Sequence, residues 1–201
     1  MLLVGLTGGL ASGKSTVAGM LGDRGAVVVD ADALAREAVA PGSEGLAKVV
    51  EEFGPQVLTS DGVLDREKLA RIVFEDDDAR RRLESIVHPE VFRRLHRRVG
   101  EVRDTATVVV FDAALLVETG FDEACDVVVV VDASPERQVE RAVSRGGLDP
   151  GDAAGRVKAQ AGREERRRRA DIVVDNSGSL GELEAHVDAL WAELSRRIGS
   201  G

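Results

Sequence analysis

The sequence has 201 residues, of which 43% are hydrophobic, so it is long enough to bury the core of one domain. Its formal net charge is −9, only 3% of its residues are aromatic, and it contains no tyrosine. Nucleic-acid-binding surfaces are usually basic and carry aromatic side chains for base stacking, so we expect no nucleic-acid partner.

We expect neither a membrane span nor a disulfide. The uncharged run at residues 1–13 is short, is interrupted by glycines and lacks a basic flank, which argues against a signal peptide or a membrane helix. Cys125 is the one cysteine in the sequence, so it cannot form an internal disulfide, and we expect a small buried side chain there. We therefore expect a cytoplasmic protein that makes no contact with membranes.

The first predicted strand, residues 2–6, leads into a glycine-rich segment, GLTGGLASGKST, at residues 5–16. Four residues of this segment match the pattern G-x-x-x-x-G-K-[ST], and they are Gly8, Gly13, Lys14 and Ser15. Glycines let backbone N–H groups surround phosphate oxygens, the lysine adds charge at the β- and γ-phosphates, and the hydroxyl can bind Mg²⁺. The segment predicts a site for a nucleoside triphosphate; the alternative is a glycine-rich turn with an exposed lysine.

The second predicted strand, residues 27–30, is followed directly by a helical pattern and ends in the segment Asp30-Ala31-Asp32. Ligands of open α/β sheets bind at the carboxyl ends of the strands, so we expect these carboxylates to face the phosphate loop. A carboxylate there can orient an acceptor hydroxyl and receive its proton, and Asp32 is our candidate for this base. The alternative is that Asp32 only caps the following helix.

Residues 32–104 show a helical pattern without a strand-like run. We expect breaks at residues 40–45, 53–56 and 60–65, and at the His88-Pro89 step, because proline disfavours a helical conformation in the residue before it. This stretch is therefore predicted to be a helical insertion.

Continuous runs of β-branched residues predict three further strands, at residues 107–112, 126–132 and 171–175. Capping side chains that precede a proline predict helices beginning at Pro135 and Pro150. Apolar residues three to four positions apart predict a final helix that packs on the sheet: Leu183, Val187, Leu190, Trp191, Leu194 and Ile198. The alternation of strands and helices predicts an α/β fold, with a parallel sheet covered by helices on both faces.

The strand at residues 107–112 ends in Asp112, followed by two alanines rather than the glutamate with which many mechanical ATPases activate water. The sequence also lacks a guanine-reading segment and the L-S-G-G-Q stretch of transport ATPases. These features disfavour a hydrolase among the proteins that use such a phosphate loop.

Arginines are prominent in the helical stretch at residues 133–169. Arg141 and Arg145 lie four residues apart, hence on one helix face, where an arginine can neutralise charge during phosphoryl transfer. We assign the run from Arg166 to Arg169 to a solvated helix face, the usual fate of such a run. After the last strand, the segment DNSG at residues 175–178 forms either part of an adenine pocket or a plain turn.

Taken together, these segments resemble the dephospho-coenzyme A kinases. The resemblance is carried, in order, by GLTGGLASGKST, VVDADALAREAVAPG, DGVLDREKL, IVHP, DAALLVE, QVERAVSRGG, RVKAQ and ADIVVDNSG, and it spans nearly the whole chain. It implies transfer of the γ-phosphate of ATP to the ribose 3′-hydroxyl of dephospho-coenzyme A, the last step of coenzyme A synthesis. It also implies a single P-loop kinase domain over residues 1–201, with a helical acceptor-binding insertion at 33–105 and a mobile lid at 142–169.

The resemblance and the motifs together assign roles to individual residues. Catalysis is assigned to Asp32, Lys14 and Arg141; ATP binding to Gly8, Gly9, Ala11, Ser12, Gly13, Lys14, Ser15, Thr16, Arg145 and Asn176; acceptor binding to Asp32, His88, Asp112 and Leu115; and Mg²⁺ to Ser15. His88 has an alternative role in setting a turn together with Pro89. Two residues depart from the common family pattern: Ala114 replaces a usual proline and Ala11 a frequent glycine.

Two other functions remain open from the sequence. One is another small-molecule or nucleotide kinase of the same fold, and the other is a non-catalytic ATP-binding sensor. The expected partner is a small molecule, dephospho-coenzyme A. We favour a monomer, although the apolar helix faces would fit another subunit as well as the sheet.

Overall fold

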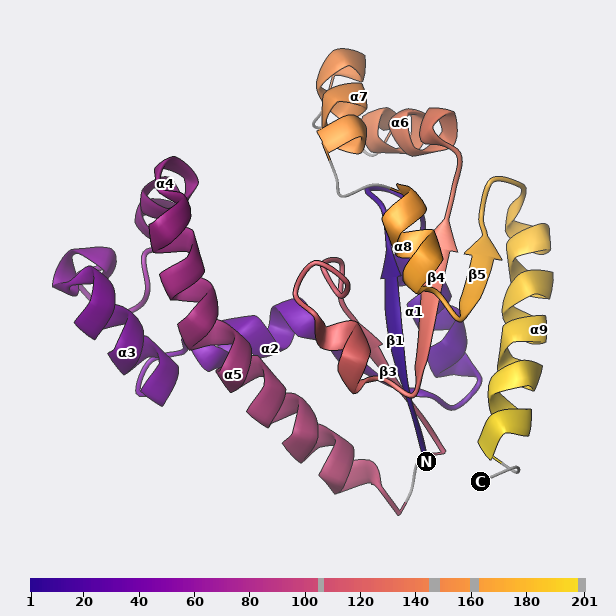
Figure 1. Cartoon of the computed structure of the whole chain (residues 1–201), viewed down its shortest axis with the longest axis horizontal. Coiled ribbons are helices and arrows are strands. Elements are labelled where there is room, and N and C mark those ends of the chain that lie inside the picture. Colours follow the sequence, from indigo (N-terminus) through magenta and orange to yellow (C-terminus); the bar gives the residue numbers. More distant parts are fainter. Residues whose placement is uncertain (105–106, 145–148, 160–162, 199–201) are drawn as a thin grey trace. The chain divides into compact units, whose positions relative to one another are not determined.

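The computed structural model describes residues 1–104, 107–144, 149–159 and 163–198 (Figure 1). Its elements, in chain order, are β1 Leu2–Gly8, α1 Lys14–Asp23, β2 Val27–Asp30, α2 Ala31–Ala38, α3 Glu44–Phe53, the 3₁₀ turn η1 Pro55–Val57, α4 Arg66–Glu75, α5 Asp77–Val102, β3 Val108–Asp112, the 3₁₀ turn η2 Phe121–Ala124, β4 Val127–Asp132, α6 Pro135–Ser144, α7 Pro150–Ala159, α8 Arg163–Arg169, β5 Ile172–Asp175 and α9 Leu180–Ile198. The described residues divide into two compact units, residues 1–29 with 102–201, and residues 30–101.

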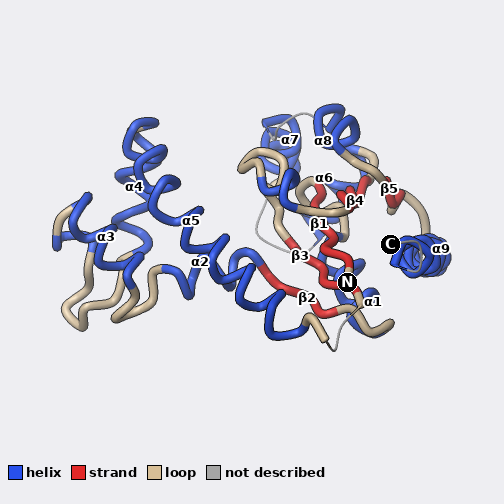
Figure 2. Tube along the Cα trace, turned by 60° about the horizontal axis from the view of Figure 1, so that its bottom comes forward, coloured by secondary structure: helices blue, strands red, loops and turns tan. Residues whose placement is uncertain are grey.

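In the described residues, the strands form one sheet with the order β2-β3-β1-β4-β5 (Figure 2). β1 pairs in parallel with both β3 and β4, and β4 pairs in parallel with β5. Every side chain of β4 is buried, as the uninterrupted run of valines predicts for a strand covered on both faces. The predicted strands and their parallel arrangement are confirmed.

Helices cover both faces of this sheet. Figures 1 and 2 show α8 and α1 on opposite sides of the strands, with α9 alongside β5. The main core lies between the sheet, α1 and α9, and includes the side chains Val4, Leu6, Val17, Leu21, Val110, Val129, Leu183, Val187, Leu190 and Leu194. The predicted packing of the last helix on the sheet is thus confirmed. Among the described residues, no helix has both the length and the apolar character that a membrane crossing requires.

Short polar side chains begin the helices at the predicted positions. α6 starts at Pro135, and the Ser134 hydroxyl accepts a hydrogen bond from the Arg137 amide at 3.3 Å. α7 starts at Pro150, and the Asp149 carboxylate accepts from the Gly151 and Asp152 amides. Both starts follow the same rule: a cap satisfies the first free amides, and proline occupies a position that needs no N–H.

The unit of residues 30–101 has its own apolar core. Helices α2 to α5 build it, and the expected breaks between α2, α3 and α4 are present. The buried side chains of this core are Val39, Leu46, Val49, Phe53, Val57, Leu64, Leu69 and Ala79. An isolated antiparallel bridge between Leu58 and Leu64 closes the loop that precedes α4.

The expectation that the helix breaks at His88-Pro89 is wrong, because α5 continues through Pro89 to Val102. Proline removes one intrahelical hydrogen bond. The turn that follows is nevertheless fixed by Glu90, which is 2% exposed and forms ion pairs with Lys48, Arg93 and Arg94. Arg93 and Arg94 lie one turn further along α5, so the pair with Lys48 of α3 is the tertiary contact of the three, and α5 continues despite the local preference of proline.

Pro89→Ala should therefore stabilise α5. The substitution restores a backbone donor at an exposed position inside the helix, so we expect the free energy of unfolding to rise by about 1–3 kcal/mol. Thermal melting followed by circular dichroism measures this change. Arg97→Ala, an exposed change on the same helix, serves as the control and should stay within about 0.5 kcal/mol. An unchanged or lower melting temperature for Pro89→Ala would contradict the prediction.

Candidate active site

The segment between β1 and α1 forms a tight loop with the predicted strand–loop–helix context. The Ser12 amide donates to the Gly9 carbonyl at 3.0 Å, and the Thr16 and Val17 amides donate to the Gly13 carbonyl at 3.0 and 3.1 Å. The amides of Lys14 and Ser15 precede these first helical hydrogen bonds, at the positive end of the helix dipole. Such amides are donors for an anion at the helix N-terminus.

The two glycines of the motif are required by close packing. A Cβ atom at Gly8 would lie 2.6 Å from the Val131 carbonyl oxygen, and one at Gly13 would collide with the side-chain amide of Asn176. Gly13 also has φ 94°, which disfavours other residues. Ala11 lies in the left-handed region as well, at φ 53°. The frequent glycine at this position of the family would avoid that strain, which is of the order of 1 kcal/mol.

Lys14 forms an ion pair with Asp112, the last residue of β3. The parallel register sets Asp112 opposite Leu6 of β1, two residues before the loop begins. Beside this pair, the buried Thr7 hydroxyl donates to the Ala114 carbonyl at 3.1 Å. Leu115, the next residue, is 59% exposed. The segment after β3 is thereby held against the end of β1. Lys14, which the sequence assigned to ATP, and Asp112, which it assigned to the acceptor, are therefore adjacent.

Arg141 and Asn176 meet beneath the loop. The Asn176 Nδ2 donates to the Ser12 carbonyl at 2.7 Å, and Arg141 Nη2 donates to Asn176 Oδ1 at 3.4 Å. Arg141 Nη1 is buried and has no hydrogen-bond partner within the described residues. Three residues predicted for the ATP site, from α6, the loop and the end of β5, are therefore adjacent.

The end of β4 carries a buried carboxylate. Asp132 is 4% exposed and accepts hydrogen bonds from Arg163 at 2.7 and 2.8 Å and from Arg167 at 2.5 Å. Burial by itself raises the pKa of Asp132, but the hydrogen bonds from both guanidinium groups prevail and hold that pKa below its ordinary value. The carboxylate is thus charged at neutral pH and ties α8 to the sheet.

The expectation of a solvated face for residues 166–169 is wrong for Arg166 and confirmed for the other three arginines, which are exposed. Arg166 is 5% exposed, and its Nη1 lies 3.6 Å from Glu118 Oε1. Its Nη2 lies 3.1 Å from the position of a Cβ at Gly9, so the guanidinium contacts the phosphate loop. Arg167 pairs with Asp132 as described and Arg169 with Asp122, yet both side chains stay exposed, as does that of Arg168. Glu118, which is distant in the sequence, lies beside the buried guanidinium of Arg166.

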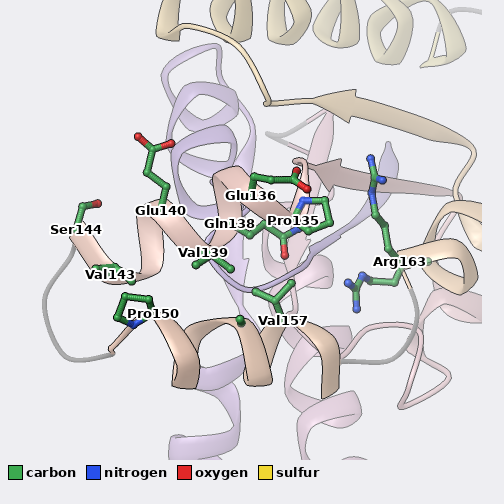
Figure 3. Close-up of a pocket in the computed structure, with 12 residues that line it drawn as sticks. Pro135, Glu136, Gln138, Val139, Glu140, Val143, Ser144, Pro150, Val157 and Arg163 are labelled. Atoms are coloured by element: carbon green, nitrogen blue, oxygen red, sulfur yellow. The ribbon is translucent and has the colours of Figure 1, made fainter.

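A cavity of about 870 Å³ lies next to this cluster, between α6, α7 and α8 (Figure 3). Val139 and Val143 from α6 and Val157 from α7 make its wall largely apolar. Gln138 and Arg166 also line it, and these same two side chains lie against Gly9. The cavity therefore adjoins the phosphate loop.

Two of the predicted site residues, Asp32 and His88, belong to the unit of residues 30–101. Asp32 is exposed in the first turn of α2, and the cap of that helix is Asp30, whose carboxylate accepts from the Asp32 amide at 2.7 Å. The alternative in which Asp32 serves only as the cap is therefore wrong. His88 is half-buried in α5. Arg145 lies outside the described residues.

The parallel sheet, the loop and the basic residues around it define a P-loop kinase. Shikimate kinase from Bacteroides thetaiotaomicron shares this fold, with a TM-score of 0.54 at 14% identity over 96% of this chain and 98% of that one. The crystal structure of TT1252 from Thermus thermophilus is more similar, with a TM-score of 0.81 at 38% identity over 96% and 97% of the two chains.

The sequence comparisons identify the family. A family model described as dephospho-CoA kinase matches residues 2–182. The dephospho-CoA kinase of Thermobifida fusca is 50% identical over 100% of both chains, and that of Cutibacterium acnes is 52% identical over 96% of this chain and 84% of its own. The chain belongs to the dephospho-CoA kinase family. The expected enzyme class, an ATP-dependent kinase of coenzyme A synthesis, is thereby confirmed.

Arg166 was missed by the sequence analysis, and its position predicts a contact with bound phosphate. Arg166→Ala should raise the KM for ATP about 10-fold or more, because it removes a charged donor beside Gly9. Arg168→Ala removes the same group from the same helix at a side chain that is 72% exposed, and it should change KM by less than about twofold. Steady-state kinetics with both variants measures the difference. Equal effects of the two substitutions would contradict the prediction.

Proposed function

We propose that this chain transfers the γ-phosphoryl group of ATP to the ribose 3′-hydroxyl of dephospho-CoA. The observation that supports this most directly is the meeting of Lys14, Arg141 and the phosphate loop at one edge of the sheet. A glycine-rich loop alone would fit many nucleotide-binding proteins. Membership of the dephospho-CoA kinase family favours this acceptor over those of other kinases with the same fold.

The loop residues Gly8 to Thr16 are proposed to bind the triphosphate. Their amides and the Lys14 ammonium supply donors and charge where the phosphoryl oxygens gain negative charge during transfer. Arg141 fits the same role, because its buried Nη1 donor has no acceptor within the described residues. A phosphate oxygen would satisfy that donor.

Ser15 is proposed to bind Mg²⁺. Its side chain is exposed in the first turn of α1, directly after the lysine of the motif. A hydroxyl oxygen is a hard ligand of the kind that this ion prefers. Mg²⁺ held there would neutralise part of the negative charge of the triphosphate.

Asp32 is proposed to align the acceptor. The 3′-hydroxyl oxygen attacks the γ-phosphorus in line, the bond to the oxygen that bridges the β- and γ-phosphates breaks, and ADP leaves. The hydroxyl proton passes to the Asp32 carboxylate, which the Asp30 cap leaves available. His88, Asp112 and the exposed Leu115 are proposed to contact the acceptor, as the family resemblance implies.

We further propose that residues 33–105 bind the acceptor and that residues 142–169 act as a lid. Closure of such a lid excludes water, so that the phosphoryl group passes to the alcohol rather than to solvent. We propose that the chain acts in the cytoplasm as a monomer and that its partner is a small molecule.

An acceptor panel with ATP tests the proposal. ADP formation by the purified chain should depend on dephospho-CoA, and the product should carry the new phosphate at the 3′ position, as phosphorus NMR can determine. Turnover with another alcohol but not with dephospho-CoA would favour another kinase of this fold. Tight ATP binding without turnover on any acceptor would favour the sensor.

Asp32→Asn should bind ATP normally but lower kcat by about 100-fold or more, because the amide cannot accept the hydroxyl proton. Asp30→Asn is the matched control two residues away, since asparagine also caps helices, and it should change kcat by less than about twofold. Isothermal titration gives the affinity for ATP and a coupled ADP assay gives kcat. Turnover of Asp32→Asn at the rate of the unchanged chain would refute its role as the base.

A further inference from the structure

We propose that Asn176 is a positioning residue that joins the phosphate loop to Arg141 and aims Arg141 at the transferred phosphate. This inference rests on the proposed role of Arg141 in phosphoryl transfer. Asn176 follows β5 directly, and it is 6% exposed. Its buried amide contacts two elements that lie far apart in the sequence, the loop after β1 and helix α6.

The backbone around Asn176 is fixed. Its N–H donates to the Asp132 carbonyl at 2.7 Å, which continues the pairing of β4 with β5 by one residue. The side chain of Asp132 is held in turn by Arg163 and Arg167 of α8. The Asn176 side chain therefore starts from a strand end that is hydrogen-bonded to the last residue of β4, which α8 holds in place.

Both ends of the Asn176 amide are in use. Nδ2 donates to the Ser12 carbonyl at 2.7 Å, and Oδ1 accepts from Arg141 Nη2 at 3.4 Å. The absence of a side chain at Gly13 makes room for this amide, because a Cβ there would collide with Nδ2. An aspartate would offer Ser12 no donor, and an alanine would contact neither partner. The position thus requires a short side chain with one donor and one acceptor.

The contact with Asn176 sets the direction of the guanidinium. Nη2 of Arg141 donates its hydrogen bond to Asn176, while the neighbouring Nη1 is buried without an acceptor in the described part of the chain. A buried donor that lacks a partner is costly, so a phosphate oxygen that reaches it gains a strong, charge-assisted hydrogen bond. Because the amide also holds Ser12, the guanidinium and the loop amides are fixed relative to one another. This arrangement is the preorganisation that lowers the barrier to phosphoryl transfer.

A double-mutant cycle tests whether Asn176 acts through Arg141. Asn176→Ala should lower kcat about 10- to 100-fold, and Arg141→Ala should lower it about 1000-fold or more. In the chain that lacks Arg141, adding Asn176→Ala should lower kcat by less than about twofold, because the group that it positions is gone. Arg141→Ala that turns over normally would overturn the role of Arg141 in the proposed function and this inference with it.

Two outcomes would overturn the inference about Asn176 alone. One is normal turnover of Asn176→Ala while Arg141→Ala is inactive; the other is a full additional loss from Asn176→Ala in the chain that lacks Arg141. Ser179→Ala is the control for a purely structural effect, since it removes the cap of α9 in the same segment. It should lower the melting temperature and leave kcat unchanged. If Asn176→Ala lowers the melting temperature by more than about 10 °C, the cycle is run with Asn176→Leu, which keeps a branched side chain and removes both amide contacts.

Discussion

Parallel pairing of β1 with its two neighbours is the constraint on which the rest of the site depends. Because neighbouring parallel strands end at the same edge of the sheet, the loop after Gly8 opens next to Asp112 of β3 and Asp132 of β4. The ion pair of Lys14 with Asp112, and the hydrogen bond of Asn176 with the loop, both follow from this arrangement. A shift of one register position would turn these side chains to the other face.

The sheet could be predicted because its signal is local. A strand buried on both faces is an uninterrupted apolar run, and β4 consists of valines up to its final aspartate. The course of α5 could not be predicted in this way. Proline has a strong local preference against the helix, and what overrides it is the burial of Glu90 among cations that include Lys48 of α3. The residues next to the proline do not reveal such a contact between distant segments.

The candidate site likewise contains residues that local sequence predicts and residues whose roles depend on distant contacts. The phosphate loop was predicted from residue types and spacing, since a backbone anion site needs glycines, one lysine and a hydroxyl in a fixed order. Arg166 was not, because a run of arginines resembles a solvated surface until Glu118 and Gly9 are known to lie beside it. Asn176 was assigned to the site, but its sequence context allows a plain turn equally well, and only the contacts with Ser12 and Arg141 distinguish the two. Distant partners, rather than residue type, determine what these side chains do.

The central place of β1 also bears on the order of events during synthesis. This strand is made before its partners β3 and β4, which begin at Val108 and Val127, so it cannot pair until the intervening residues have been made. Pairings of such long range are slow to form, and they leave apolar side chains and unpaired backbone groups exposed in the meantime. The unit of residues 30–101 has a core of its own and is complete earlier. On the ribosome, the helices of residues 30–101 are therefore expected to fold before β1 pairs with β3 and β4.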